Sequence, residues 1–274
     1  MASNDNRPMR IGLRRSRSAA IALSVAVFAL PLVFALLVPH PLEQPFGVDF
    51  VLYRDVAARW LTGGPYFEAY QLAGPYDIRA GDVLYPPVGL LLFVPFAVLP
   101  AAVAWPLWWG IPLAATAWAV SRLRPRPAVW PLLALCVVWP TTLLKTWTGN
   151  PAIWCVAALA LGTLWYWPSV IVLLKPSLAP IALFGANRRR WWVALAVFVL
   201  LCLPFGSLWL DWVASVVNSR GGGPLYSTLE IPMLLLPLVA WLGRRVPARG
   251  GSVQGASGSH AHLMRDRDTA PGPS

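Results

Sequence analysis

Apolar and polar residues alternate along the chain in long blocks. The first apolar run, residues 19–38, holds no charged side chain. As a helix it would be about 30 Å long, which matches the hydrocarbon core of a bilayer. Further apolar runs follow at 86–99, 101–121, 128–144, 151–167, 168–185, 191–207 and 229–243. This pattern predicts an all-α, polytopic integral membrane protein.

The composition supports a membrane protein. The chain is 57% hydrophobic and 12% charged, whereas a soluble domain has about 25% charged residues. In water, such a surface would expose apolar patches that aggregate. The net charge of +11 is carried by arginines between the apolar runs, where cytoplasmic anchoring explains them better than nucleic acid binding. The arginine clusters are Arg122/Arg124/Arg126, Arg188–Arg190 and Arg244/Arg245/Arg249.

The arginine clusters leave two topologies open. If every apolar run crosses the membrane, there are eight spans, and the first cluster lies outside, against the positive-inside rule. If the short, proline-bearing runs 86–99 and 168–185 are re-entrant, six spans remain and every cluster lies inside. We therefore predict six to eight transmembrane segments.

The chain divides into a membrane domain and two tails. Residues 1–18 are polar and basic, 19–245 form the membrane domain, and 246–274 read as a disordered tail. A cleaved signal peptide is the alternative for 19–38, but the run exceeds the usual h-region and no A-x-A site follows. We expect an uncleaved first helix in the cell membrane, with the N-terminus in the cytoplasm.

Residues 39–85 form a polar segment that we expect outside the cell. It contains six acidic residues and only three arginines, Arg54, Arg59 and Arg79, so positive charge is sparse there. A loop of this length is usually functional or disordered, and its many aromatic residues favour function. The acidic residues are Glu43, Asp49, Asp55, Glu68, Asp77 and Asp82.

Within this external loop, residues 49–61 have the pattern of an amphipathic helix. Five apolar residues fall on one face at helical spacing, and they are Phe50, Tyr53, Ala57, Trp60 and Leu61. Such a helix is expected in the membrane–water interface. Asp55 precedes Arg59 by four residues, a spacing that favours an ion pair. Asp49 lies at the expected start of the helix, where it either caps the helix or has a functional role.

The chain has two lysines, Lys145 and Lys175. Lys175 lies inside an apolar run beside Pro176, and an ammonium group buried in a membrane is a functional-site hypothesis by default. An anionic phosphate would be its natural partner. Lys145 lies at the edge of a run and is equally explained by snorkelling to the headgroups.

Two further motifs have both functional and structural explanations. Tyr85-Pro86-Pro87 closes the external loop, either at a binding site or as a rigid entry into the membrane with an interfacial tyrosine. Gly149-Asn150 separates two apolar runs and is either a site or a turn.

These motifs together resemble glycosyltransferase family 87. The resemblance rests on Asp49-Phe50, Tyr85-Pro86-Pro87, Gly149-Asn150 and Leu174-Lys175-Pro176, which occur in the family's order. Members are multi-spanning enzymes of the GT-C superfamily, typified by α-mannosyltransferases that use polyprenyl-phosphate mannose. The family usually has Gly-Gln where this chain has Gly149-Asn150, and its members are commonly longer.

The resemblance implies an inverting membrane glycosyltransferase. It would transfer a hexose, with mannose expected, from a polyprenyl-phosphate sugar to a cell-envelope glycolipid or glycan. Asp49 would be the general base. A phosphate leaving group needs cations, so Lys175 would bind it, with Arg54, Arg59 and Arg79 as further candidates. Substrate contacts would come from Asp55, Tyr85 and Asn150. No cofactor and no protein-bound metal is expected, although a divalent cation stays open.

Two other functions are consistent with parts of the sequence. The short chain would also suit a catalytically silent relative that scaffolds a larger transferase. The proline-broken segments would also suit a transporter of small solutes or lipids.

Overall fold

The computed structural model describes residues 44–79, 81–220 and 230–245. The predicted basic tail (1–18), first span (19–38) and C-terminal tail (246–274) lie outside the described residues. Contacts divide the chain into two units, Met1–Arg244 and Arg245–Ser274. All described residues but Arg245 belong to the first unit, which contains every described helix and strand.

The described residues are almost entirely helical, which confirms the all-α prediction. The α-helices are α2 (Val48–Leu61), α3 (Ala69–Ala73), α4 (Leu90–Val98), α5 (Ala101–Leu123), α6 (Trp130–Val138), α7 (Pro140–Thr148), α8 (Ala152–Trp165), α9 (Ala179–Ala182), α10 (Arg189–Cys202), α11 (Leu208–Asn218) and α12 (Ile231–Leu242). The 3₁₀ segments are η2 (Pro87–Gly89), η3 (Pro127–Val129), η4 (Trp167–Leu174), η5 (Pro176–Leu178), η6 (Leu183–Gly185) and η7 (Leu203–Phe205). Two short parallel strands, β1 (Tyr76–Asp77) and β2 (Ser219–Arg220), connect the segment between α3 and η2 to the end of α11.

Prolines divide the predicted spans into shorter helices. Among the described residues, α5 alone is long and apolar enough to cross a membrane unbroken. Two bent pairs raise the number to three: η3–α6 with α7, at 54°, and α10–η7 with α11, at 90°. The prediction of six to eight spans includes residues 19–38, which lie outside the described residues, so this count does not test it. Several of the breaks lie at prolines, such as Pro140 and Pro176, where a proline removes a backbone donor and clashes with the preceding turn, although α5 accommodates Pro106 and Pro112 without a break.

The two runs suggested to be re-entrant form only short pieces. Run 86–99 becomes η2 and α4, and run 168–185 becomes a series of 3₁₀ turns with the four-residue α9. Neither is a continuous helix of spanning length.

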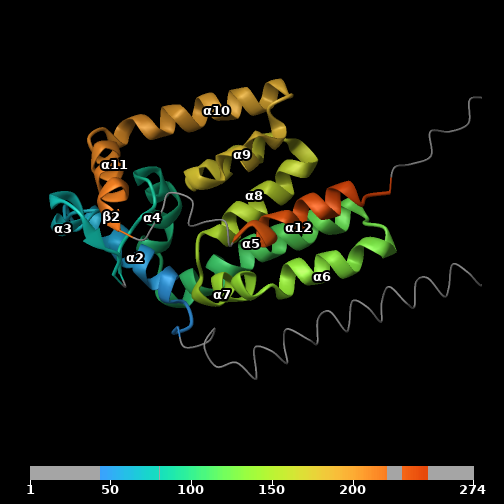
Figure 1. The fold of residues 1–274 in the computed structure, drawn as a ribbon, viewed down its shortest axis with the longest axis horizontal. Coiled ribbons are helices and arrows are strands. Elements are labelled where there is room, and N and C mark those ends of the chain that lie inside the picture. Colours follow the sequence, from blue (N-terminus) through green and yellow to red (C-terminus); the bar gives the residue numbers. More distant parts are fainter. Residues whose placement is uncertain (1–43, 80, 221–229, 246–274) are drawn as a thin grey trace, which may run out of the picture. The chain divides into compact units, whose positions relative to one another are not determined.

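Helix α8 is the centre of the helical packing. It contacts α5, α12 and the 3₁₀ segment η4, and Figure 1 shows it between α10 and α12. Most of its side chains are buried and many are small, including Ala152, Cys155, Ala158 and Gly162. Small side chains let neighbouring helices approach closely.

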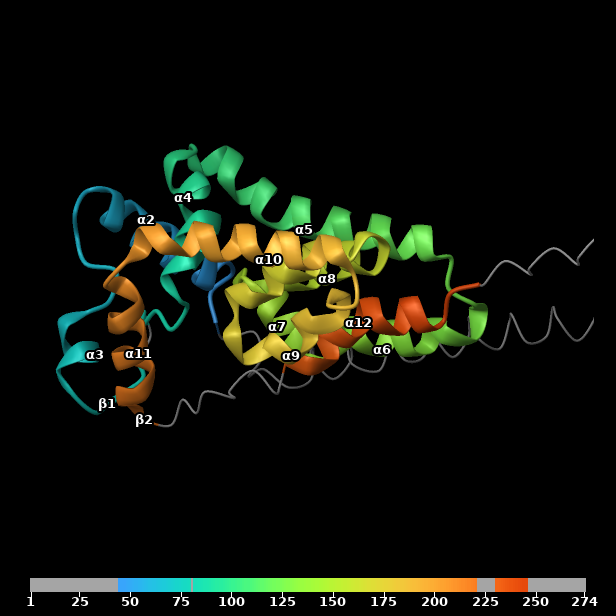
Figure 2. The same cartoon turned by 90° about the horizontal axis from the view of Figure 1, so that it is seen from above.

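The predicted amphipathic helix is present as α2. It ends at Leu61 with Thr62 as its C-cap, and the following Gly63 has a φ of 84°. The predicted aromatic face lies in the protein core: Phe50 contacts three tryptophan rings of α5, and Tyr53 stacks on Phe93 of α4. Leu61, predicted on the same face, is 46% exposed. Figure 2 shows α2 beside α4 at the same end as α3 and α11.

Candidate functional site

The junction between α7 and α8 is a tight turn with one conformational requirement. Gly149 caps the C-terminus of α7 with a φ of 71°, a backbone conformation that favours glycine. A Cβ atom there would lie 2.7 Å from Cζ2 of Trp109 and 3.0 Å from Cβ of Phe50. The Gly149-Asn150 motif is therefore a turn, and this turn presents Thr148 and Asn150 to α2.

Two tryptophans of α5 hold this junction in place. The indole Nε1 of Trp108 donates to the carbonyl of Gly149 at 2.7 Å, and that of Trp109 donates to the carbonyl of Thr146 at 2.7 Å. The last carbonyls of a helix lack partners within the helix, so these bonds satisfy them and fix the end of α7. The backbone N–H of Gly47 also donates to the carbonyl of Trp147 at 3.0 Å, which attaches the start of α2 to α7.

Asp49 points toward this junction instead of capping its own helix. The N-cap of α2 is Gly47, and no side chain caps it. The Oδ2 atom of Asp49 accepts hydrogen bonds from Nδ2 of Asn150 at 2.7 Å and from Oγ1 of Thr148 at 2.9 Å. Both donors are buried, and Asp49 itself is half-buried. Thr148 was not among the predicted site residues.

The amide of Asn150 connects Asp49 to Tyr85. Its Oδ1 atom accepts hydrogen bonds from the Tyr85 hydroxyl and from the backbone N–H of Ala152, both at 3.1 Å. Because Oδ1 faces two donors and Nδ2 faces a carboxylate, the amide has one favourable orientation. Tyr85 is buried and its ring packs edge-on against Tyr53.

Lys175 lies over the Tyr85 ring. Its Nζ atom is 5.5 Å from the ring centroid, within the range of a cation–π contact. The residue separates η4 from η5, where Pro176 interrupts the helix, and it is 2% exposed.

A buried glutamate joins both lysines of the chain. The Nζ atom of Lys175 is 2.6 Å from each carboxylate oxygen of Glu230, and the Nζ atom of Lys145 is 3.7 Å from Oε1. The side chains of Lys175 and Glu230 are 3% exposed, and that of Lys145 is 30% exposed. Two ammonium groups share one carboxylate, so the cluster has one excess positive charge when all three groups are ionised. We call Lys145, Lys175 and Glu230 the lysine cluster.

Glu230 was not among the predicted site residues. The only available signal was an acidic residue at the start of the apolar run 229–243. Its partner Lys175 is 55 residues away along the chain, so no local spacing connects the two.

Two of the predicted phosphate-binding arginines have partners elsewhere. Arg54 donates to the carbonyls of Phe96 and Leu99 at 3.2 and 3.3 Å, at the end of α4. Arg59 pairs with Glu68 at 2.5 Å and donates to the Pro65 carbonyl at 2.8 Å.

The predicted pair between Asp55 and Arg59 does not form. Asp55 is exposed, while the guanidinium of Arg59 faces the turn that follows α2. Ten residues separate Asp49 from Arg59 on α2, or about 15 Å along the helix axis. Arg59 and Asp55 are thus not brought to the Asp49–Asn150 contact.

Arg79 belongs to a separate cluster between α3 and η2. Its guanidinium lies 4.4 Å from the Tyr70 ring centroid, and its backbone N–H donates to Oδ2 of Asp82 at 2.7 Å. The Tyr70 hydroxyl donates to Oδ1 of Asp82. Desolvation and the neighbouring Asp82 carboxylate raise the pKa of Tyr70 to about 12. The structure therefore connects Asp49, Asn150, Tyr85 and Lys175, and it gives the predicted arginines and Asp55 other surroundings.

Within residues 44–79, 81–220 and 230–245, no group of three or more His, Cys, Asp or Glu side chains is placed to hold a metal ion. The expectation that the enzyme uses no cofactor stays an untested prediction.

The arginines of the helical part gather near the C-terminal end of α5, away from the α7–α8 junction that Trp108 and Trp109 contact. Arg122 stacks over Trp118, whose ring contacts Trp165, and Arg188 stacks over the adjacent Tyr166. The backbone N–H of Arg126 donates to the carbonyl of Gly243 at 2.9 Å. This bond places Arg244, the first arginine of the third cluster, beside the first cluster. We call this region, made of Arg122, Arg124, Arg126, Arg188–Arg190 and Arg244, the arginine end.

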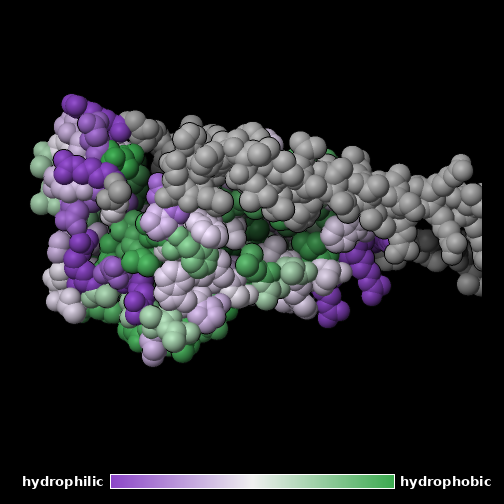
Figure 3. All heavy atoms as spheres, turned by 90° about the horizontal axis from the view of Figure 1, so that it is seen from below, coloured by the Kyte–Doolittle hydropathy of each residue, from purple (hydrophilic) through white to green (hydrophobic). Residues whose placement is uncertain are grey.

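The arginine end and the Asp49 contact are well separated. Arg122 follows Trp108 by fourteen residues on α5, or about 21 Å along the axis. On the face shown in Figure 3, hydrophilic side chains gather at the two ends and apolar side chains lie between them. Such a distribution is typical of a protein that crosses a bilayer.

The comparison with protein-family models gives one match. The model of glycosyltransferase family 87 matches residues 84–258, which is more than half of the chain. The matched segment contains Tyr85, Asn150 and the lysine cluster, while Asp49 precedes it. No curated protein and no solved structure matches the chain. The family match favours a transferase over the transporter. The chain therefore belongs to glycosyltransferase family 87 and is a membrane glycosyltransferase.

Proposed function

We propose that this enzyme, with a GT-C-type site, transfers a hexose, with mannose as the expected sugar, from a polyprenyl phosphate to a cell-envelope glycolipid or glycan. The observation that carries the proposal is a continuous series of contacts from Asp49 through Asn150 and Tyr85 to the lysine cluster. This series joins the half-buried carboxylate of Asp49 to the lysine cluster, which has one excess positive charge. An inverting transfer from a phosphate carrier needs both of these groups.

Asp49 is suited to act as the general base. Its Oδ2 atom is occupied by Thr148 and Asn150. No hydrogen bond to Oδ1 is recorded from the described part of the chain, so this oxygen is available to the acceptor hydroxyl. Two fixed donors on one oxygen hold the carboxylate in a single orientation, and a positioned base requires this.

The lysine cluster is suited to the phosphate of the donor. Negative charge develops on the phosphate oxygen as the sugar departs, and a fixed cation stabilises it. Glu230 engages the ammonium of Lys175 with both oxygens, so the more exposed Lys145 would contact the phosphate first. Lys145 lies one turn of α7 before Thr148, about 4.5 Å along the axis, which places the two functions close together.

The position of the site supports a lipid-linked donor. We expect the arginine end to face the cytoplasm, because positive charge is retained on that side of a membrane. Asp49 and the α7–α8 junction would then lie toward the outer face. A polyprenyl carrier would keep its tail in the bilayer and present its sugar phosphate there.

Replacing Asp49 by asparagine tests the proposal directly. Purified protein is supplied with labelled polyprenyl-phosphate mannose and a membrane glycolipid extract, and transfer is measured. Because a general base contributes about 10²–10⁴-fold, Asp49→Asn should lose at least about 100-fold in rate. Asp77→Asn, an exposed carboxylate of the same external segment, is the matched control and should keep normal rates. Equal transfer by wild type and Asp49→Asn would remove Asp49 as the base.

A further inference from the structure

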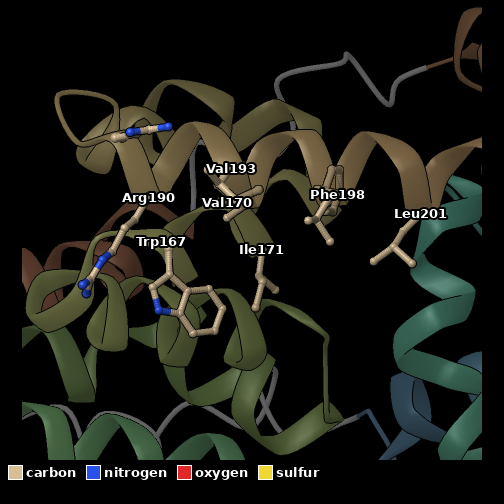
Figure 4. A pocket seen from close by; sticks show the side chains of 10 residues that line it. Trp167, Val170, Ile171, Arg190, Val193, Phe198 and Leu201 are labelled. Carbon is tan, nitrogen blue, oxygen red and sulfur yellow. The ribbon is translucent and has the colours of Figure 1, made fainter.

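A long apolar groove runs between η4 and α10, away from the Asp49 contact. Its volume is about 870 Å³, within the range of ligand pockets, which is about 300–1,000 Å³. Trp167 and Ile171 form one wall, and the side chains of Val197 and Leu201 on α10 form the other. Figure 4 shows Arg190 at one end of the groove and Leu201 at the opposite end.

The groove is open along its length. Val193, Val197 and Leu201 are 57%, 50% and 46% exposed. Arg189 and Arg190 are the charged residues among those that line it. The occupant must therefore be apolar over most of its length and must interact with guanidinium groups at one end.

The arginines at the end of the groove favour an anion. Arg189 and Arg190 begin α10 and are exposed, and no ion pair with either is recorded from the part of the chain that the structure describes. Neighbouring Arg188 is stacked over Tyr166. Cations at a helix N-terminus face the positive end of the helix dipole, which is unfavourable unless an anion compensates.

The length of the groove is close to the thickness of the hydrocarbon region of one leaflet. Arg189 and Leu201 are twelve residues apart on α10, or about 18 Å along the axis. One leaflet contributes about half of the 30 Å hydrocarbon core, or about 15 Å. A two-chain membrane lipid seated with its phosphate at the arginines would thus lay an acyl chain along most of the groove.

We propose that this groove binds one anionic glycerophospholipid from the leaflet on the arginine side. Its phosphate would lie against Arg189 and Arg190, and one acyl chain would lie between η4 and α10. The site is separate from that proposed for the sugar donor, because the arginine end and the Asp49 contact lie toward opposite ends of α5. The bound lipid would stabilise η4, the segment that leads directly into Lys175.

Native mass spectrometry of the full chain in detergent tests this site. The protein is equilibrated with equal amounts of phosphatidylglycerol and phosphatidylcholine, and the retained lipids are counted. We expect one phosphatidylglycerol to be retained in preference to phosphatidylcholine. Each basic residue near a membrane surface contributes appreciably to binding of anionic lipid, so Arg189→Gln with Arg190→Gln should lower this preference by about tenfold.

Two further variants separate the groove from general surface charge. Val197→Trp fills the groove at a half-exposed position and should abolish retention of phosphatidylglycerol with both arginines present. Arg122→Gln with Arg126→Gln is the matched control, since both arginines are exposed at the same end and neither lines the groove. This control should leave retention unchanged.

Three results would overturn the proposal. They are equal retention of the two lipids by wild type, normal phosphatidylglycerol retention by Val197→Trp, and an equal loss in the Arg122/Arg126 control. Displacement of the bound lipid by an equimolar amount of polyprenyl phosphate would assign the groove to the carrier instead.

Discussion

The lysine cluster and the arginine end differ in how their charged side chains are buried and paired. The lysine cluster holds Lys175 and Glu230 almost completely buried, with both ammonium groups close to one carboxylate. At the arginine end, Arg122 and Arg188 are exposed and lie over aromatic rings. In the described part of the chain, no carboxylate pairs with them. The lysine cluster therefore buries Lys175 against an opposite charge, whereas the arginine end leaves Arg122 and Arg188 exposed.

This difference separates two roles of charge in a membrane protein. A buried ion carries a desolvation cost that only a fixed partner offsets, so loss of that partner is strongly destabilising. An exposed arginine costs little and contributes little to stability, but it influences which side of the membrane a loop occupies. Changes at the lysine cluster should thus affect folding and catalysis, whereas changes at the arginine end should affect orientation.

Cysteines introduced at Ala69 and at Ser121 should react with a water-soluble thiol reagent from opposite sides of the membrane. In a background without the three native cysteines, Ala69→Cys is expected to react with an impermeant thiol reagent added outside. Ser121→Cys, beside Arg122, should react only after the cytoplasmic face is opened. Both positions are exposed, so burial does not explain a failure to react. Labelling of Ala69→Cys from the cytoplasm alone would reverse the proposed orientation.

Replacing Glu230 by glutamine should have the largest effect on stability. It leaves the buried ammonium of Lys175 without its carboxylate, and breaking a buried pair in this way costs about 3–5 kcal/mol. Thermal unfolding in detergent measures the loss. Arg122→Gln at the arginine end is the control and should change the free energy of unfolding by less than about 1 kcal/mol. Similar losses in both variants would contradict the contrast between the two ends.

The amide of Asn150 should be essential to the transfer reaction. Asn150→Leu removes the donor to Asp49 and the acceptor of the Tyr85 hydroxyl. A hydrogen bond to a charged group contributes about 1.5–3 kcal/mol, and the loss of that much transition-state stabilisation would slow transfer by about 10–100-fold. Asn150→Gln keeps the amide and should retain more activity, because the family that the chain resembles usually has Gly-Gln where this chain has Gly149-Asn150. Transfer from the labelled donor distinguishes the two variants. Equal rates would show that Asn150 does not position Asp49.

Replacing Gly149 by alanine should lower the stability of the protein more than the same replacement at Gly63. Both residues have positive φ values, 71° and 84°, so alanine strains the backbone by about 1–2 kcal/mol at either position. At Gly149 the added Cβ also meets Trp109 and Phe50, whereas at Gly63 no atom lies within 4 Å. Thermal unfolding of Gly149→Ala should therefore show the larger loss. Equal losses would indicate that the α7–α8 junction is not tightly packed.

Part of the site could be predicted from the sequence because its signals are local. Asp49, Tyr85, Asn150 and Lys175 each lie in a short motif of the chain. The structure brings the motifs into one series of contacts. The helix carrying Asp49 was also predicted almost to the residue, since apolar spacing and the following glycines determine it.

The partners of the charged residues could not be predicted in the same way. Arg54 bonds carbonyls more than forty residues away, and Arg59 pairs with Glu68 beyond the turn instead of Asp55 on its own helix. Helical spacing indicates which side chains share a face, but it does not show which other segment packs against that face.

The sequence by itself determined that this is a helical membrane protein, where its apolar runs lie and which motifs place it near one family of transferases. These properties depend on neighbours within a few residues. Only the tertiary structure decided how prolines divide the runs into short helices, and that Glu230 joins Lys145 and Lys175. A buried charge needs a partner, and which segment supplies that partner depends on how distant parts of the chain pack together.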